Sequence, residues 1–323
     1  MSAPGASFAY AISEAGQATQ LPLDGAELAA ANAHFLWVHV NGSDPACLAW
    51  LRSEDAGIGR SAVDALTARE TRPRAAALGH GAIVNLRGPD ADPDPHDDTG
   101  LVSIRMWAER GRVVSLGYRP LAAMPDLRMA VEGRRVRDAG DFITTLALLL
   151  TDRLAPEIRE VGDRLDVLEE RVAQADQAFR EELVEVRTEA IEYRRFIWPQ
   201  KEAIGRLTGT DFVWLDEDDR LKMREVHDQI ARIFEELESI RERAALVSDQ
   251  LWDLRAEETN RRTLLLSIVA AIFLPLGYVA GLMGMNVPGI PFSHDPHGFW
   301  KITGLTVLTG TVLMLWFRRR GWL

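Results

Sequence analysis

The chain has 323 residues, 48 acidic and 37 basic, and a formal net charge of −11. This balance excludes nucleic acid as an expected partner, because binding to a phosphate backbone requires a basic surface. The single cysteine, Cys47, excludes a disulfide framework and a four-cysteine zinc site. The sequence opens without a basic and apolar leader, so we expect no signal peptide.

Residues 1–139 are predicted to form a mixed α/β domain. Short runs rich in β-branched residues and bounded by Gly or Asp predict strands, and helical periodicity predicts helices between them. His34 and His39, at and within one strand, are interpreted as structural. The expected strands are 8–12, 35–40, 82–86, 102–107 and 112–115, and the expected helices are 45–53, 61–68 and 121–131.

Residues 140–262 have a purely helical pattern and are predicted to form a bundle and stalk of long helices. Asp141 is expected to cap the first helix, which runs to about residue 175. The second covers about 179–207, and Pro199 predicts a kink in it.

A third helix is predicted to begin at the acidic residues 216–219, which suit a helix N-terminus. Residues 220–273 contain no Pro or Gly that would stop it. At 1.5 Å per residue, a helix over 219–283 would be roughly 95 Å long. Helices of this length need partners along their length, which indicates an oligomer.

Two segments near the C-terminus are predicted to be transmembrane helices, 263–285 and 299–318. The first has no charged residue and exceeds the roughly 20 residues that span a bilayer, and aromatic residues extend the second. Two buried core helices are the alternative, but such helices rarely run so long without a charge. The external loop is expected at 286–298 and a short tail at 319–323.

Basic residues flank the two spans on one side only. Arg255, Arg261 and Arg262 precede the first span, residues 318–320 follow the second, and the connecting segment has only Lys301. The positive-inside rule therefore predicts a multi-pass protein of the plasma (inner) membrane. Both termini, and so the long N-terminal part, are expected in the cytoplasm.

One face of the third helix is polar or acidic before the membrane and mostly small within it. Its positions follow a 3.5-residue period. Two spans cannot enclose a pore, so this stripe predicts several copies in a cyclic ring. Small residues that only let helices approach closely are the alternative. The predicted pore-lining residues are Asp249, Asp253, Ala256, Asn260, Thr263, Ser267, Ala270, Leu274, Gly277 and Gly281.

The segment 272–286, IFLPLGYVAGLMGMN, closely resembles the end of the first membrane helix of the CorA superfamily of metal-ion transporters. Their signature is Gly-Met-Asn, here Gly284, Met285 and Asn286, between two C-terminal spans. The resemblance covers nearly the whole chain. It implies a funnel-shaped homopentamer with an α+β cytoplasmic domain, long stalk helices and five pore-lining first spans.

The same resemblance implies that the signature forms the outer selectivity ring. Amide oxygens of Asn286 could bind the water shell of a divalent ion without removing it, which avoids a large dehydration cost. Gly284 is expected to permit a backbone turn that a side chain would obstruct.

Several segments resemble the ZntB branch of this superfamily, which is associated with zinc. Met283 stands where the magnesium branch usually has Tyr, and the external loop contains no Glu. Residues 35–42, 70–78 and 83–90 also resemble the ZntB branch, whereas Pro288 replaces its usual Gly. The transported ion is therefore expected to be Zn2+, with Mg2+, Co2+ or Ni2+ as the alternative.

His294, Asp295 and His297 in the external loop are candidates for weak zinc collection, and a solvated loop is the alternative. The sequence contains neither a Walker loop for nucleotide hydrolysis nor the His-Glu-x-x-His motif of zinc hydrolases. We therefore expect no enzyme and no cofactor. Transport would then use an ion gradient, the membrane potential or protons, for which Asp249 is a candidate. The direction of transport stays open. A membrane-anchored structural or sensing protein is the alternative from another class.

Overall fold

The chain forms two compact units, residues 1–247 and 248–323, and the boundary falls within the longest helix, α7 (Glu217–Met283). Every statement below concerns the described part of the chain. The computed structural model describes residues 7–23, 33–69, 72–93, 100–174, 176–209, 212–285, 287, 289–292 and 295–322.

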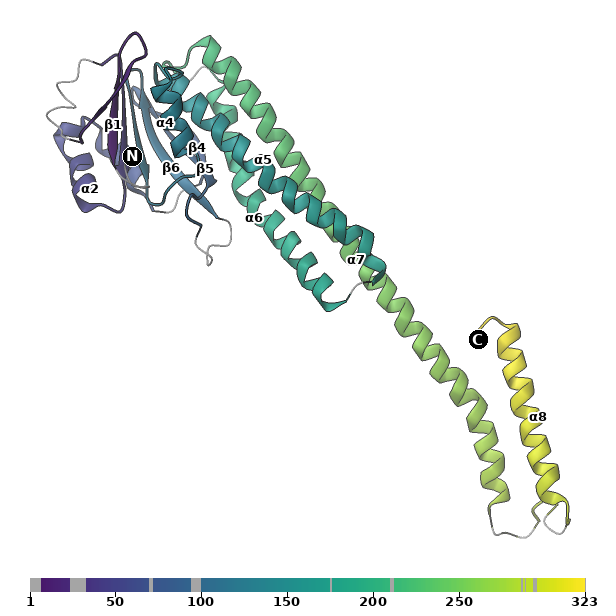
Figure 1. Ribbon diagram of the computed structural model, residues 1–323. Coiled ribbons are helices and arrows are strands. Elements are labelled where there is room, and N and C mark those ends of the chain that lie inside the picture. Colours follow the sequence, from purple (N-terminus) through teal and green to yellow (C-terminus); the bar gives the residue numbers. More distant parts are fainter. Residues whose placement is uncertain are drawn as a thin grey trace. The chain divides into compact units, whose positions relative to one another are not determined.

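The first unit contains a seven-stranded mixed sheet in the order β2-β1-β3-β7-β6-β5-β4 (Figure 1). The β3 and β7 strands are parallel, and all other neighbours are antiparallel. The strands are β1 (Phe8–Ile12), β2 (Ala18–Leu21), β3 (Phe35–Asn41), β4 (Arg74–Leu78), β5 (Gly81–Pro89), β6 (Leu101–Glu109) and β7 (Arg112–Gly117).

Helices cover both faces of this sheet because successive strand residues point to opposite sides. Val38 and Val40 of β3 belong to the core cluster that includes Leu51 of α2 (Pro45–Arg52) and Leu66 of α3 (Arg60–Thr67). The ring of Trp37, the residue before Val38, lies 4.9 Å from the Phe142 ring of α5 (Ala139–Arg171) on the other face. A short 3-10 helix, Glu54–Ala56, separates α2 and α3, and α4 spans Met124–Glu132.

Long helices follow the sheet in the first unit: α5, α6 (Gln177–Leu207) and the first part of α7. Asp138, not Asp141, caps α5, because its side chain accepts a hydrogen bond of 2.9 Å from the Asp141 backbone N–H. The prediction of Asp141 as the cap was wrong by one turn. The α6 helix runs through Pro199 without a break, and a 3-10 turn, Val172–Gln174, ends α5.

Ion pairs and hydrogen bonds join these helices along their length. Arg164 of α5 donates to Glu189 of α6 at 2.7 Å, and Arg243 of α7 donates to Glu169 of α5 at 2.7 Å. The buried residues beneath them include Leu165 and Ile240. The long helices therefore find partners within the first unit of their own chain, in addition to any that an oligomer supplies.

The second unit contains the rest of α7 and the helix α8 (Gly298–Arg319). The bounds of α8 lie within one residue of the segment 299–318, which was predicted as the second span. Both helices are long and apolar enough to cross a membrane, and almost none of either apolar segment is buried. The α7 helix ends at Met283, close to the expected end of the first span.

Sequence patterns predicted the main elements of the sheet region but missed β2 and β4. Both are edge strands, and β4 consists of one Arg, three Ala and one Leu, a composition that is poor in strand-forming residues. The helix expected from Leu121 begins at Met124 instead, because Leu121 forms a bridge with Asp90.

Candidate ion pathway and external loop

The predicted pore-lining residues form one face of α7 in the second unit, and all ten are exposed in the single chain. Another ridge of the same helix packs within the unit, where Ile268 is buried and Leu276 is half-buried. Gly277 is nine residues from Ile268, about 2.5 helical turns, so the two lie on opposite sides of the helix. The polar and small face is thus turned away from the packed ridge.

Hydroxyl groups on this face have their protons directed to the helix backbone. Thr263 Oγ1 donates to the Thr259 carbonyl at 2.9 Å, and Ser267 Oγ donates to the Thr263 carbonyl at 2.9 Å. Each hydroxyl oxygen then presents its remaining lone pairs outward, as an acceptor. Such acceptors can bind the water shell of a cation.

The glycines of this face create open space. A Cβ built on Gly277 or Gly281 would meet no described atom within 4 Å. Because the glycines have no side chains, another helix, or an ion with its bound water, can come close to the backbone on this face. Leu274 is the one large side chain among the predicted pore-lining residues within the span, and it is 72% exposed.

Three polar residues continue the same face before the apolar segment: Asp249, Asp253 and Asn260. All are exposed, and among the described residues neither carboxylate is paired with a basic side chain. The nearby ion pair joins Arg262 and Glu258 at 2.5 Å. These unpaired carboxylates can attract cations toward the face.

The Gly-Met-Asn signature follows directly on α7. The Gly284 backbone N–H donates to the Ala280 carbonyl at 3.0 Å, and the Met285 N–H donates to the Leu282 carbonyl at 3.4 Å. Asn286 lies outside the described residues, as does Pro288. Gly284 and Met285 thus continue from the last turn of α7, and the role of the signature as a selectivity filter stays a prediction.

Gly284 does not meet the expected steric need for glycine within one chain. A Cβ at this position would meet no described atom closer than 3.4 Å, an ordinary contact, and the residue does not have a left-handed φ. The prediction that a side chain would obstruct the turn is therefore wrong for the single chain, because the helical turn continues into Gly284.

In the loop between α7 and α8, Asp295 holds the start of α8. Its carboxylate accepts a hydrogen bond of 2.9 Å from the His297 backbone N–H and pairs with the Lys301 ammonium. The bond from Lys301, and then that from His297, holds the pKa of Asp295 below its usual range. His294 lies outside the described residues, which contain no group of three potential metal ligands. These contacts favour the solvated-loop alternative.

Comparison with known proteins gives matches along almost the whole chain. Residues 32–319 match the model of the family described as CorA-like Mg2+ transporter protein. The divalent cation transporter CmaX of Pseudomonas aeruginosa is 36% identical over 296 residues, covering 89% of this chain and 87% of that protein. The zinc transport protein ZntB of Pectobacterium atrosepticum is 30% identical over 288 residues, covering 89% and 88%.

Solved structures show the same fold. The structure of full-length CmaX matches with a TM-score of 0.81 and 34% identity, over 97% of this chain and 96% of that one. The CorA magnesium transporter of Methanocaldococcus jannaschii matches with a TM-score of 0.84 over 98% of each chain, and at 17% identity this likeness concerns the fold alone. With the family model covering most of its length, the chain belongs to the CorA-like Mg2+ transporter family, a family of membrane transporters for divalent cations.

Proposed function

We propose that this protein carries a divalent cation, preferentially Zn2+, through a membrane pore formed by five copies of the chain. The main support for a pore is the exposed face of α7, where hydroxyl oxygens and glycines lie on the side of the helix away from the packed ridge. Membership of a family of divalent cation transporters supports the type of cargo.

The pore requires several copies because each chain has only two helices able to cross a membrane among its described residues. A cyclic arrangement of first spans would place Thr263 and Ser267 in successive rings of oxygen acceptors. Asn286 would form the outer ring, where neutral amide oxygens bind a hydrated ion and still release it.

Zinc is favoured by a series of relatives that are named as zinc transport proteins, at about 30% identity over almost the whole chain. The residue Met283 and the absence of Glu from the external loop point the same way. Mg2+, Co2+ or Ni2+ is the second candidate cargo, and the family description favours Mg2+ among these.

The driving force that fits the sequence is an ion gradient or the membrane potential. No acidic residue occurs between Thr263 and Asn286, so the span itself offers no carboxylate for a proton relay. A proton coupled to transport would have to use groups before the span, such as Asp249. We place both termini in the cytoplasm and the protein in the plasma (inner) membrane, on the charge pattern.

Zinc and magnesium flux into liposomes containing the purified protein tests the proposal. We expect faster Zn2+ than Mg2+ uptake, and a loss of about tenfold or more in Asn286→Leu, because five acceptors vanish from one constriction. Asn286→Asp should transport more slowly while binding Zn2+ more tightly, since several carboxylates hold a divalent ion too strongly to release it.

The two variants also separate a pore from a membrane anchor. The Asn286 variants should keep the mass of the wild-type oligomer, so a loss of flux cannot come from disassembly. Zn2+ flux at the wild-type rate in both variants would place the selectivity filter elsewhere. No metal flux in the wild-type protein would contradict the transport function itself.

A further inference from the structure

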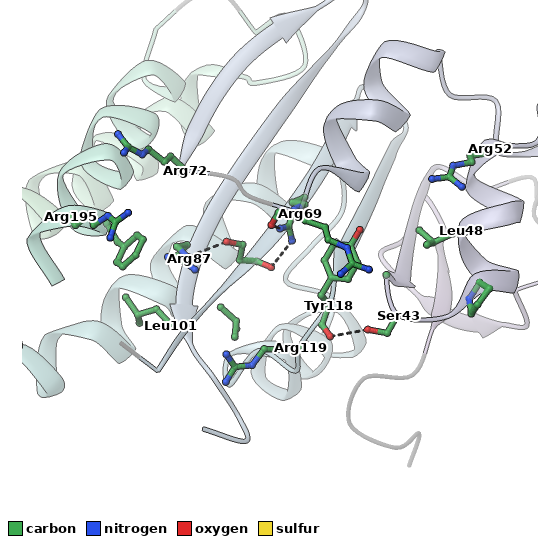
Figure 2. A pocket seen from close by; sticks show the side chains of 16 residues that line it. Ser43, Leu48, Arg52, Arg69, Arg72, Arg87, Leu101, Tyr118, Arg119 and Arg195 are labelled. Carbon is green, nitrogen blue, oxygen red and sulfur yellow. Dashed lines mark hydrogen bonds between the residues drawn. The ribbon is translucent and has the colours of Figure 1, made fainter. Parts of the chain in front are cut away.

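The first unit contains a cavity of about 1030 Å³ lined by many arginines (Figure 2). Its walls come from α2, β5, β6 and α6, from the segments that follow β3 and β7, and from the residues on either side of 70–71. The arginines that line it are Arg52, Arg69, Arg72, Arg87, Arg105, Arg119 and Arg195.

The charge of this cavity is opposite to that of the whole chain. The chain has a net charge of −11, yet none of the described residues that line the cavity is Asp or Glu. Arg119 pairs with Asp90, outside the lining, at 2.5 Å. Among the described lining residues the guanidinium groups have no carboxylate beside them in the lining itself, which gives this lining a positive potential.

Arg105 lines the cavity and is only 4% exposed. Its Nε donates to the Ala68 carbonyl at 3.0 Å and its Nη2 to the Arg69 carbonyl at 2.9 Å. Burial lowers the pKa of this guanidinium, which reflects the cost of removing its charge from water. Neutral carbonyls accept its hydrogen bonds, and no carboxylate among the described residues pairs with it.

Further arginines surround the opening. Arg52, Arg69, Arg72 and Arg195 are exposed and come from separate segments, and within the described residues none of them has a carboxylate partner. Figure 2 shows their side chains arranged around the same space. Like charges brought together from distant parts of the chain repel one another until an anion neutralises them.

Aromatic and aliphatic groups complete the lining. The Arg105 guanidinium lies 5.0 Å from the centre of the Tyr118 ring, and that of Arg87 lies 4.0 Å from the centre of the Phe196 ring. Leu48 and Leu101 add apolar surface. The cavity therefore offers flat and apolar contacts beside its charges, a combination that suits an anion with an organic part.

We propose that this cavity binds a small anion with several phosphate groups, of the class of the nucleoside triphosphates. Guanidinium groups bind phosphate oxygens with two parallel hydrogen bonds, so several arginines can hold a phosphate chain. The volume is at the upper end of small-molecule sites, which are roughly 300–1000 Å³. The cavity is formed by residues of the first unit, whereas the proposed ion pathway uses residues of the second, so this proposal does not depend on the transported ion.

Fluorescence anisotropy of ATP carrying an N-methylanthraniloyl group tests this site on the full-length protein in detergent. EDTA in every sample prevents metal bridges between protein and phosphate. We expect saturable binding that unlabelled ATP reverses. Displacement by inorganic tripolyphosphate at equal concentration assigns recognition to the phosphate chain, and weaker displacement adds contacts with the nucleoside; both support the site.

The double variant Arg72→Gln/Arg195→Gln should weaken this binding about tenfold or more, because two of the phosphate contacts are lost. The matched control is Arg159→Gln/Arg187→Gln, which removes two exposed arginines of α5 and α6 that do not line the cavity. The control should bind like the wild type.

Equal weakening in both double variants, or no saturable binding at about 1 mM nucleotide, would overturn the proposal. So would the finding that the arginines meet acidic residues of a neighbouring copy. In that case Arg72→Gln/Arg195→Gln would lower the oligomer mass in native mass spectrometry, and the wild type would not bind the nucleotide.

Discussion

At the residue scale, burial determines the properties of His39 in the middle of β3. Its Nδ1 lies 2.9 Å from Ser115 Oγ, which also accepts a hydrogen bond of 2.9 Å from Trp37 Nε1. Burial, with a smaller contribution from Arg128, lowers the pKa of His39 to about 4. The interpretation of this histidine as structural agrees with its place in the core.

His39 should make the folded protein sensitive to acid. Below pH 6.5 the histidine of the unfolded chain takes up a proton, whereas the folded chain resists it down to about pH 4. The contribution of neutral His39 to the free energy of unfolding is therefore fully present above pH 6.5. It falls by about 3 kcal/mol as the pH drops to 4. In His39→Gln, the free energy of unfolding, measured with urea on the full chain, should change less between pH 6.5 and pH 4 than in the wild type. Equal slopes for the two proteins would contradict the prediction.

At the element scale, α7 has a packed ridge on one side and an exposed face on the other, and Gly277 and Gly281 lie on the exposed face. Ile268 is 3% exposed, whereas a Cβ on Gly277 would meet no described atom within 4 Å. An ordinary transmembrane helix that only anchors a protein needs no such face. The proposed pore gives this asymmetry a function.

Gly277→Leu should block transport, because copies around an axis would place several leucine side chains in the pore at one level. We expect Zn2+ flux to fall about tenfold or more, with the oligomer intact. Gly304→Leu in α8 is the matched control, since a Cβ on Gly304 also meets no described atom within 4 Å. A pore lined by α7 requires that the control transports at a near wild-type rate and that Gly277→Leu does not.

At the scale of the whole molecule, a protein with two spans can form an ion path only by assembly. We expect native mass spectrometry in detergent to give five times the chain mass of 36.0 kDa. The reason is the one-sided face of α7, which needs an axis to surround. A stable monomer or dimer as the main species would rule out the proposed pore.

Topology gives a second test at this scale. We expect the external loop to face outward and both termini to lie in the cytoplasm, because arginines gather before the first span and after the second. Single cysteines introduced by Ser293→Cys or Leu323→Cys, each in a Cys47→Ser background, report the two sides. An impermeant thiol reagent should label position 293 on intact cells. Labelling of position 323 would reverse the orientation.

The sequence by itself determined the features that depend on neighbours along the chain. Helical periodicity, acidic helix starts and charge-free runs gave the long helices and both candidate spans, because these patterns repeat every few residues. The face of α7 was predictable for the same reason, since positions on one helix follow from a fixed period. The signature Gly284, Met285 and Asn286 then pointed to the family.

Tertiary structure alone decided what depends on distant segments. The edge strands β2 and β4 are held by their partners β1 and β5, and their own residues give little strand signal. The arginine cavity could not be predicted from the sequence either, because Arg52, Arg105 and Arg195 are far apart in the chain and each looks like an ordinary surface charge. Only folding brings such charges together, since the sheet and α6 place them around one space.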